Sequence, residues 1–496
     1  MAEVDHRKVL GEGDPAIAAV QSDSREVTPG ALFVAVPGFK TDGRDYVRAA
    51  VAAGAAAVLI ERPLPGIIIP QVIVADARLA LAQAAAAFFG HPGRELAVVG
   101  VTGTKGKTTV GFVLDAILRA AGNKTALLTT IKVDIAGVEY PARLTTPEAP
   151  ELQARLREAV DAGASYAIVE VSSHACELKR VAAMPVRAAV FTNLSHDHLD
   201  LHGDMAAYFA AKESLFARLV PGGVAVVNGD DEWGRRIRVP EAANRVRFGW
   251  EEGNDYRARE VRGGWGGVSF VAAGPGGWSL KLAARLAGAY NAVNILAAVA
   301  TAKELGVDDG AIGRGVAALP AVPGRLELHE INDRLRVVID YAHSPSSFEA
   351  ALAEIKRLPA ERYVVVFGCT GERDREKRPI MGELAARAAD AVIITTDDPY
   401  SEDPAAIAAE VEAGVRRVPG ATYEIILERG SAIKRALEIA NRAGGPAVVA
   451  LLGKGHETVQ KVAAGEIPCD DRELTARAAL SLGLMRPAGG RAENET

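Results

Sequence analysis

Cysteine is scarce in this sequence. Three cysteines, Cys176, Cys369 and Cys469, stand among 496 residues, and their spacing fits neither a metal site nor a disulfide framework. Such sparse use is typical of a reducing compartment, so we expect a cytoplasmic protein. The first residues, MAEVDHRKVLGEGD, lack a charged segment followed by an apolar one, and no secretory leader is expected.

Long apolar runs and blocks of one charge are lacking as well. No stretch reaches about 18 uninterrupted apolar residues, the length needed to cross a bilayer, which excludes a membrane span. The 57 basic and 63 acidic residues give a formal net charge of −6, and no lysine/arginine block stands out. General nucleic-acid binders carry such a block, so nucleic acid is not an expected partner. Any phosphate must therefore be held by local groups.

The chain does have the composition of a folded globular protein. Hydrophobic residues make up 49% and charged residues 24% of it. At about 150 residues per domain, this length predicts about three domains. Short β-branched runs alternate with Ala-rich helical stretches throughout, a pattern typical of βαβ units around mostly parallel sheets. The predicted fold class is therefore α/β.

Two proline- and glycine-rich stretches divide the sequence, HPG before residue 94 and LPAVPGR before residue 326. We predict an α/β domain over residues 1–92, a central domain over 93–325 and a Rossmann-like domain over 326–496. The central domain should contain a phosphate-loop type of sheet, mostly parallel, and the Gly-punctuated stretch 261–282 should form an antiparallel hairpin at its edge.

The strongest local signal is the segment VVGVTGTKGKTTV. An apolar run typical of a buried strand leads into Gly106, Lys107 and Thr108, and a helical pattern follows. Glycine lets backbone N–H groups approach phosphates, a lysine supplies charge to them, and a threonine hydroxyl suits Mg²⁺. The general pattern has glycine five residues before Gly106, where this chain has Val101. The segment predicts a nucleotide site, with an ordinary Gly-rich turn as the alternative.

A second group of polar residues follows later strands. The segment YAIVEVSSHA places Glu170 near the end of a buried strand, where a carboxylate can hold Mg²⁺ directly or through water. The segment FTNLSHDHLDLHGDM then brings three histidines close to Asp200. Taken alone, these side chains could form a zinc hydrolase site. A metallo-hydrolase signature would have histidine directly after Asp200, where this chain has Leu201, and zinc would leave the phosphate loop unexplained.

The loop T-G-T-K-G-K-T-T resembles that of the ATP-dependent Mur ligases and their folylpolyglutamate synthetase relatives. The histidine segment is similar to the family pattern NLxxDHLDxHGxxxxYxxAK. The matching residues are Asn193, Asp197, His198, Asp200, His202, Gly203, Tyr208 and Lys212. The resemblance implies that Glu170 and His198 hold a second Mg²⁺ and that Lys212 is carbamylated. A lysine held neutral in a confined site can capture CO₂ and become an anionic oxygen ligand. The alternative for Lys212 is an exposed helix lysine.

The resemblance also implies binding sites for both nucleotides. The residues implied for ATP are Gly103, Thr104, Lys105, Gly106, Lys107, Thr108, Thr109, Asn291, Asn294, Arg325 and Asp340. Lys107, Lys212, Glu170 and His198 would be catalytic, with Thr108 joining the last three around the metal. The start of the chain, SDSREVTPG to DGRDYV, resembles the members that add the third peptide residue. The residues implied for their UDP-muramoyl-dipeptide are Ser24, Thr145, Thr146, Ser172 and Arg180.

In the third predicted domain, GERDREKRP, DDPYSEDP and LGKGHE complete the family pattern. The residues implied for the amino-acid site are Arg373, Asp397, Asp398, Tyr400, Gly453 and Glu457. Arg373 offers a planar fork for a carboxylate, and Glu457 a counter-charge for an ammonium. Diaminopimelate members usually have an arginine where this chain has Tyr400, and a phenol cannot replace that charge. The resemblance favours meso-2,6-diaminopimelate, and L-lysine stays open.

Together these matches imply an ATP-dependent amide ligase in peptidoglycan precursor synthesis, and so a role in cell shape and cell division. ATP and Mg²⁺ are the expected cofactors, with carbamylated Lys212. UDP-N-acetylmuramoyl-L-Ala-D-Glu and a diamino acid are the expected partners, and a monomer is expected. Two alternatives stay open, another amide ligase such as a folylpolyglutamate synthetase and a non-enzymatic P-loop protein. The DSR and DGR motifs argue against the first, and the set of Glu170, His198 and Lys212 against the second.

Overall fold

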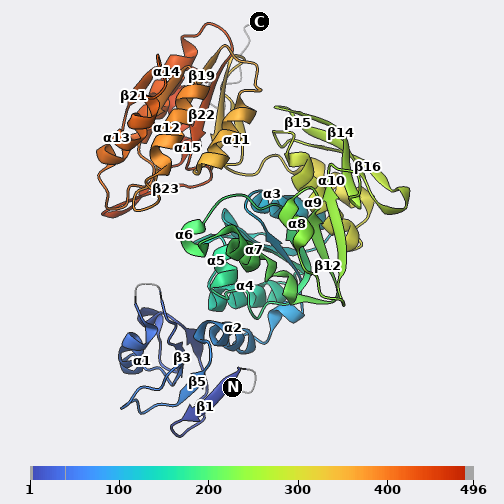
Figure 1. The fold of residues 1–496 in the computed structure, drawn as a ribbon, viewed down its shortest axis with the longest axis vertical. Coiled ribbons are helices and arrows are strands. Elements are labelled where there is room, and N and C mark those ends of the chain that lie inside the picture. The colour runs from blue at the N-terminus through green and yellow to red at the C-terminus, as the bar shows by residue number, and fades with distance from the viewer. Residues whose placement is uncertain (1–3, 39–40, 486–496) are drawn as a thin grey trace, which may run out of the picture. The chain divides into compact units, whose positions relative to one another are not determined.

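The computed structural model describes residues 4–38 and 41–485, and in it three α/β sheets follow one another along the chain (Figure 1). These residues pack as two compact units. The first holds the chain up to Arg259, with Val271–Leu282 and Val293–Ala318. The second holds Glu260–Phe270, Ala283–Ala292 and the chain from Leu319 onward. The predicted α/β class with three domains, each around its own sheet, is confirmed, and the first compact unit holds the first sheet and most of the second. The boundaries at residues 92 and 325 stay a prediction.

The first sheet has five strands in the order β1-β5-β4-β3-β2, and only β1 is antiparallel to its neighbour. Strands β3 to β5 are buried along their whole length, as expected of a parallel sheet covered on both faces. Asp76 caps the Ala-rich helix α2 by accepting the Leu79 N–H at 2.9 Å. The elements are β1 (His6–Leu10), β2 (Ala19–Gln21), β3 (Ala31–Val34), α1 (Val47–Ala52), β4 (Ala57–Ile60), β5 (Gln71–Val74) and α2 (Ala77–Phe88).

The second sheet has eleven strands in the order β16-β15-β14-β13-β12-β11-β6-β10-β7-β8-β9. Its strands are β6 (Ala97–Thr102), β7 (Thr125–Leu128), β8 (Lys132–Ile135), β9 (Val138–Pro141), β10 (Tyr166–Glu170), β11 (Val186–Phe191), β12 (Leu219–Asn228), β13 (Asn244–Gly249), β14 (Tyr256–Gly264), β15 (Gly267–Ala273) and β16 (Ser279–Ala284). Its helices are α3 (Lys107–Ala120), α4 (Ala149–Asp161), α5 (Ser173–Glu177), α6 (Leu199–His202), α7 (Met205–Glu213), α8 (Glu232–Arg236), α9 (Asn291–Glu304) and α10 (Asp309–Ala318).

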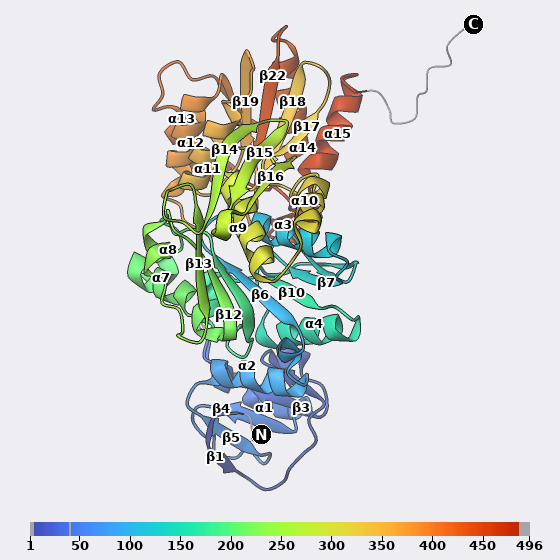
Figure 2. The ribbon, with the colours of Figure 1, turned by 90° about the vertical axis from the view of Figure 1, so that its right-hand side faces the viewer.

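The strands from β13 to β7 in this order are all parallel (Figure 2). Antiparallel β8 and β9 extend the sheet at one edge, and β14 to β16 extend it at the other. Two residues join the neighbouring strands β14 and β15, so the predicted hairpin is present. Because the central strands are parallel, the carboxyl ends of β11, β6, β10 and β7 lie next to one another. A site built from the loops after them is possible at that edge.

The third sheet has six strands in the order β17-β18-β22-β19-β20-β21, of which only β17 is antiparallel. Strands β23 and β24 form a separate antiparallel pair. The strands are β17 (Glu327–Glu330), β18 (Leu335–Asp340), β19 (Arg362–Phe367), β20 (Ala391–Ile394), β21 (Tyr423–Ile425), β22 (Ala447–Leu452), β23 (Val459–Val462) and β24 (Gly465–Pro468). The helices are α11 (Pro345–Ile355), α12 (Lys377–Ala388), α13 (Pro404–Val415), α14 (Arg429–Asn441) and α15 (Asp471–Ser481).

Helices cover both faces of the third sheet. Val338 and Phe367 pack with apolar residues of α11, α12 and α13, while Val337 and Val366 pack on the opposite face with α14 and α15. Since neighbouring strand residues face opposite sides, the continuous apolar runs in the sequence supply both layers. The strand order reverses between β19 and β22, which is where open α/β sheets bind ligands. Within residues 4–38 and 41–485, we find no helix that is long and apolar enough to cross a membrane.

Candidate active site

The phosphate loop joins the end of β6 to the start of α3. Gly103 and Gly106 adopt φ values of +145° and +86°, in the region that favours glycine. A Cβ atom at Gly103 would lie 1.9 Å from the Thr192 Oγ1 atom, so this position has no room for another residue. The loop therefore requires glycine for its backbone angles and for its packing.

Asn193, at the end of neighbouring β11, fixes the shape of this loop. Its Oδ1 atom accepts the Lys105 N–H at 3.0 Å, and its Nδ2 atom donates to the Lys105 carbonyl at 3.0 Å. The Asn193 carbonyl also accepts the Thr104 N–H at 2.8 Å. These bonds span the two strand ends, so the loop is held in one shape by the sheet below it.

Lys107 and Thr108 open α3 and face the carboxylate of Glu170. The Lys107 ammonium donates to the carbonyls of Gly103 at 3.1 Å and Thr104 at 3.0 Å, and lies 3.9 Å from Glu170 Oε1. The Thr108 hydroxyl donates to Glu170 Oε2 at 3.0 Å. The structure thus brings together Lys107 and Thr108, which the sequence placed after one strand, and Glu170, which it placed near the end of another.

Glu170 ends β10 and is only 3% exposed. Besides Thr108, its Oε2 atom accepts the Thr130 N–H at 3.2 Å. Thr130 follows β7 and was not singled out in the sequence. A hydroxyl and a carboxylate oxygen side by side are hard donors of the kind that Mg²⁺ prefers, so the donor set of Thr108 and Glu170 fits that ion.

Lys212 lies on α7 and is 1% exposed. Its Nζ atom donates to the Gly103 carbonyl at 2.8 Å, the same carbonyl that Lys107 contacts, and lies 4.6 Å from the centroid of the Tyr208 ring. Burial and the nearby Lys107 ammonium lower the pKa of the Lys212 amine well below its usual range, although Asp197 and Glu170 oppose this. Lys212 is therefore a buried lysine beside the phosphate loop, and the exposed alternative is wrong.

Tyr208 links Lys212 to the histidine segment. Its hydroxyl lies 3.2 Å from Thr104 Oγ1. Its ring lies 5.1 Å from that of His202 and 6.2 Å from that of His198, between centroids. His198 has a left-handed φ of +52°, and its ring stands edge-on to that of His174 at 4.9 Å. His198 is thus close to the phosphate loop through Tyr208. The side chain of Asp200 lies outside the described residues.

Four of the five residues implied for the muramoyl-dipeptide form a hydrogen-bonded group next to Glu170. The Thr146 hydroxyl donates to the Glu170 carbonyl at 2.8 Å and accepts the Ser172 N–H at 3.1 Å. Arg180 donates to the Thr146 carbonyl at 3.1 Å and forms an ion pair with Glu148 at 2.6 Å. Thr145 accepts the Thr130 hydroxyl at 3.0 Å. The segment with Thr145 and Thr146 is therefore joined by hydrogen bonds to Glu170 and Thr130, next to the Thr108 and Glu170 oxygens that suit Mg²⁺. Ser24 instead lies in a 3₁₀ turn (Ser24–Glu26) after β2.

The remaining residues implied for ATP lie on α9 and around β18. Asn294 stands against the phosphate loop, since a Cβ atom at Gly106 would lie 2.4 Å from its Oδ1 atom. Asn291 begins the same helix and donates to the Ala287 carbonyl at 2.7 Å. In the second unit, Asp340 accepts the Leu326 and Ala342 N–H groups at 2.7 and 2.8 Å. Arg325 stacks over the Tyr341 ring at 4.9 Å.

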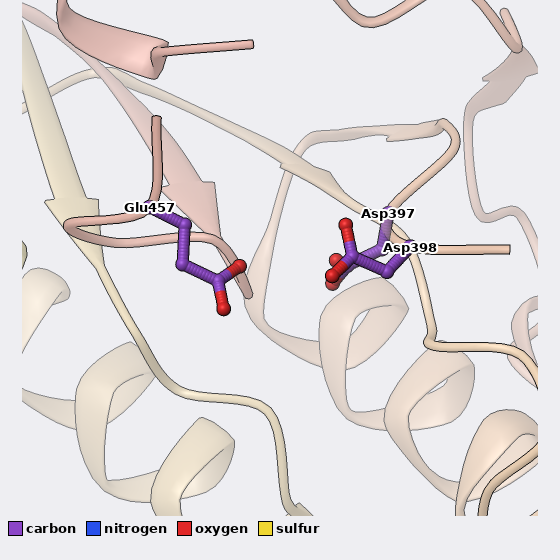
Figure 3. Close-up of side chains that lie close together, drawn as sticks. All are labelled: Asp397, Asp398 and Glu457. Atoms are coloured by element: carbon purple, nitrogen blue, oxygen red, sulfur yellow. The ribbon is translucent and has the colours of Figure 1, made fainter. Parts of the chain in front are cut away.

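Three carboxylates meet at the carboxyl ends of β20 and β22. Figure 3 shows Asp397 and Asp398 on one loop and Glu457 on another. Among the described side chains, these three form the one group of histidine, cysteine or acidic residues placed closely enough to hold a metal. The ammonium of Lys454 lies among them, 2.7 Å from Asp398, 2.8 Å from Glu457 and 3.8 Å from Asp397. A lysine therefore already supplies a cation to this cluster.

Lys454 is fully buried, and the sequence did not single it out. Burial disfavours its charge, but the three carboxylates raise the pKa of Lys454 above its usual value. Burial also raises the pKa of Asp397 and Glu457, and Lys454 opposes that rise in both. Lys454 therefore helps to keep its acidic neighbours ionised.

Arg373 and Tyr400 follow β19 and β20. The Arg373 guanidinium lies 5.9 Å from the centroid of the Tyr400 ring. Tyr400 adopts a left-handed φ of +50° and donates its N–H to the Lys461 carbonyl at 3.0 Å. Gly453 donates its N–H to the Asp340 carbonyl at 3.1 Å. All six residues implied for the amino-acid site thus lie in the loops after β19, β20 and β22, at the reversal of strand order.

Comparisons with known proteins agree with this arrangement. Residues 16–89 match the model described as Mur ligase family, catalytic domain, residues 101–302 the Mur ligase middle domain, and residues 324–455 the Mur ligase, glutamate ligase domain. A curated relative from Geobacillus thermodenitrificans, a UDP-N-acetylmuramoyl-L-alanyl-D-glutamate–2,6-diaminopimelate ligase, is 41% identical over 476 residues. The alignment covers 94% of this chain and 96% of that one.

A UDP-N-acetylmuramyl-tripeptide synthetase from Roseiflexus sp. is 42% identical over 494 residues, covering 95% of this chain and 96% of that one. A solved structure of a UDP-N-acetylmuramoyl-L-alanyl-D-glutamate–2,6-diaminopimelate ligase superposes with a TM-score of 0.66 at 30% identity. It covers 94% of this chain and 95% of its own. Similarity of this extent, over nearly the whole chain and all three of its sheets, shows that this chain belongs to the Mur ligase family.

Proposed function

We propose that this member of an ATP-dependent ligase family joins a diamino acid to UDP-N-acetylmuramoyl-L-Ala-D-Glu in peptidoglycan precursor synthesis. The bond would form between the D-Glu γ-carboxylate and an amine of the diamino acid. One observation carries the proposal: the Glu170 carboxylate contacts Thr108 of the phosphate loop, while the Glu170 carbonyl contacts Thr146 of the loop implied for the dipeptide. Phosphate and acceptor carboxylate would thus meet at one residue. We place the protein in the cytoplasm as a monomer.

The reaction would begin with transfer of the ATP γ-phosphoryl group to the D-Glu carboxylate, which releases ADP and leaves an acyl phosphate. The amine then attacks the acyl carbon, a C–N bond forms, the C–O bond to phosphate breaks, and the amine loses its proton. Phosphoryl transfer depends on position and charge stabilisation. Lys107, fixed at the start of α3, would place its positive charge on the transferring oxygens.

Four side chains would hold Mg²⁺, namely Thr108, Glu170, His198 and Lys212 as its carbamate. The ion supplies charge neutralisation at the phosphates when it is bound. The neutral Lys212 amine is the form that can react with CO₂, and burial beside Lys107 favours that form. Ser24 would approach the uridine diphosphate, and Asn291, Asn294, Arg325 and Asp340 would contact the rest of ATP.

The diamino acid would bind at the loops after β19, β20 and β22. Arg373 would pair with its carboxylate and Glu457 with its amine. Because relatives named as diaminopimelate ligases span nearly the whole chain, we favour meso-2,6-diaminopimelate. Tyr400 keeps L-lysine as the alternative, since a phenol offers no charge to a second carboxylate. Another amide ligase of the folylpolyglutamate synthetase type is a more distant alternative. The non-enzymatic P-loop alternative is dropped, because the chain belongs to an amide-ligase family over nearly its whole length.

The direct test is phosphate release from ATP and Mg²⁺ in the presence of UDP-N-acetylmuramoyl-L-Ala-D-Glu. Either meso-diaminopimelate or L-lysine is added in parallel reactions. We expect release that requires both the dipeptide and the diamino acid, and that is faster with diaminopimelate. Phosphate release in the reaction with lysine but not in the one with diaminopimelate would overturn our choice of amino acid. No dependence on either substrate would overturn the ligase proposal.

Replacing Lys454 with methionine should weaken binding of the diamino acid selectively. Without its ammonium, the pKa values of Asp397 and Glu457 rise further, so both carboxylates become protonated nearer to neutral pH and lose their attraction for an amine. Truncating one member of a buried charge pair costs at least about 2 kcal/mol, or roughly 30-fold in KM. The defect should shrink as the pH rises through the new pKa values, because the carboxylates ionise again.

This prediction is measured as KM for the diamino acid between pH 6.5 and 8.5, with KM for ATP as the internal reference. Lys434→Met is the matched control, since Lys434 is an exposed lysine on α14. A Lys454→Met enzyme whose KM for the diamino acid equals that of wild type at all pH values would contradict the role given to Lys454.

A further inference from the structure

The two loops after β19 and β20 are joined by reciprocal hydrogen bonds. The Glu372 N–H donates to the Glu402 carboxylate, and the Glu372 carboxylate accepts the Ser401 N–H at 3.1 Å as well as the Ser401 hydroxyl. The Gly371 N–H also donates to the Asp398 carbonyl at 2.8 Å. Each loop therefore supplies both a donor and an acceptor to the other, an arrangement that we call the loop clasp.

Arg378 stands beneath the clasp. It lies in the first turn of α12 and is fully buried. Its guanidinium grips Glu402 with two bonds, Nη1 to Oε2 at 3.0 Å and Nη2 to Oε1 at 3.1 Å. The same group donates to the Thr370 carbonyl at 3.2 Å and to Glu410 of α13 at 2.9 Å. One planar side chain thus ties both loops to two helices, which a lysine could not do with the same geometry.

Two residues in the clasp loops adopt backbone angles that are unfavourable without supporting contacts. Glu372 and Tyr400 adopt φ values of +55° and +50°, which non-glycine residues adopt at a cost. Surrounding contacts must therefore maintain these turns. The Arg378 guanidinium and the Glu372 N–H lower the pKa of Glu402 to about 2, so the carboxylate that receives them stays ionised at neutral pH.

The clasp also carries two residues implied for the amino-acid site. Arg373 directly follows Glu372, and Tyr400 directly precedes Ser401. The Arg373 guanidinium and the Tyr400 ring are 5.9 Å apart, and this separation depends on the two loops keeping their register. Arg378 bonds to Glu402, Glu410 and the Thr370 carbonyl and to neither of these side chains, so any effect that it has on them passes through the loop backbones.

We propose that Arg378 is a positioning residue for the diamino acid: through Glu402 and the Thr370 carbonyl it holds both loops as one unit and so sets the separation of Arg373 and Tyr400. The inference rests on the proposed function for its kinetic consequence and on geometry alone for its effect on the loops. Arg378 itself would contact no substrate.

The kinetic test compares Arg378→Met, Arg378→Lys and Arg387→Met. Arg378→Met should raise KM for the diamino acid by about tenfold, the loss expected for charge-assisted hydrogen bonds, with kcat and KM for ATP within about twofold of wild type. Arg378→Lys keeps the charge but loses the planar fork, so its KM for the diamino acid should lie between those of wild type and Arg378→Met. Arg387 is the control, because it is an exposed arginine of the same helix paired with Glu383.

A second variant guards against misfolding of Arg378→Met. Glu372→Ala removes the acceptor of both Ser401 bonds at an exposed side chain, so it should fold and still raise KM for the diamino acid selectively. Circular dichroism melting checks that both proteins are folded. Wild-type KM for the diamino acid in a folded Arg378→Met or Glu372→Ala enzyme would overturn the proposal, as would an equal rise of KM for all three substrates.

Amide hydrogen exchange gives a readout that needs no turnover. Loss of Arg378 should raise exchange at Glu372 and Ser401, whose N–H groups form the clasp, while the Arg387→Met protein should match wild type. Unchanged exchange would overturn the role of Arg378. Raised exchange in a protein without ligase activity would support the loop role and count against the proposed function instead.

Discussion

Replacing Lys107 with alanine is expected to lower kcat by about 10³-fold, the loss seen when one preorganised charge or donor is removed from a reacting group. Its ammonium sits 3.9 Å from Glu170 and bonds to the Gly103 and Thr104 carbonyls, so it is already placed at the phosphate loop. No other lysine of the loop is held at the start of α3. Because the transition state of phosphoryl transfer spreads charge over oxygen, loss of this cation should affect kcat more than substrate KM.

The measurement is phosphate release under saturating ATP, dipeptide and diamino acid. The loop should keep its shape in the variant, since Asn193 holds Lys105 from both sides without using Lys107. Lys124→Ala is the control, an exposed lysine that donates to the Ala162 carbonyl at 3.0 Å. A Lys107→Ala enzyme that turns over at the wild-type rate would remove the basis for the assignment of the phosphate site.

The parts of the site that the sequence could predict are those written in consecutive residues. A buried strand, a glycine loop and a helix start lie together in the segment from Val98 to Val110, so local pattern was enough to find Lys107 and Thr108. Glu170 could be placed at a strand end for the same reason. That β10 lies directly beside β6 could not be read locally, because strand order depends on packing of the whole sheet.

Residues whose roles depend on distant partners were missed. In the sequence, nothing distinguishes Lys454 from any other lysine in a glycine-rich loop. Only the fold brings it to Asp398, which is 56 residues away along the chain. Arg378 likewise stands in a charged run, GERDREKRP, where nothing distinguishes it from its exposed neighbour Arg375. In both cases burial decides the role, and burial of a charged side chain follows from tertiary structure rather than from local pattern.

The positions of individual cations explain how a chain with a net charge of −6 can bind phosphates. The cations expected to meet phosphate or carboxylate are single residues at the site, Lys107 and Arg180 in the first unit and Arg325 and Arg373 in the second. Lys454 and Arg378 instead pair with carboxylates of the protein itself. The acidic composition of the chain is thus compatible with binding of highly phosphorylated substrates. Surface charge in general would not attract them, which agrees with the absence of a basic block.

Replacing Lys212 with alanine should also remove most activity, by about 10²- to 10³-fold, if this residue supplies an anionic oxygen beside the phosphates. Lys212 is 1% exposed and its amine lies 2.8 Å from the Gly103 carbonyl, so CO₂ would meet it directly at the loop. The pKa of this amine is well below its usual value, and a neutral amine is required for carbamate formation. The lowered pKa should therefore favour the modification, which should be lost as acid protonates the amine.

Two measurements separate this role from a packing role of the lysine stem. Wild-type protein incubated with ¹³C-bicarbonate should show one carbamate signal that Lys212→Ala lacks and that Lys124→Ala keeps. Removal of dissolved CO₂ should slow the wild type, and added bicarbonate should restore it, while neither treatment should change the residual rate of Lys212→Ala. A packing role alone predicts the loss of rate without any dependence on CO₂, because a lysine side chain that only fills space does not need the carboxylate that CO₂ adds to its amine. A wild type without a carbamate signal and indifferent to bicarbonate would therefore leave Lys212 as a buried neutral lysine and take the carbamate out of the metal site.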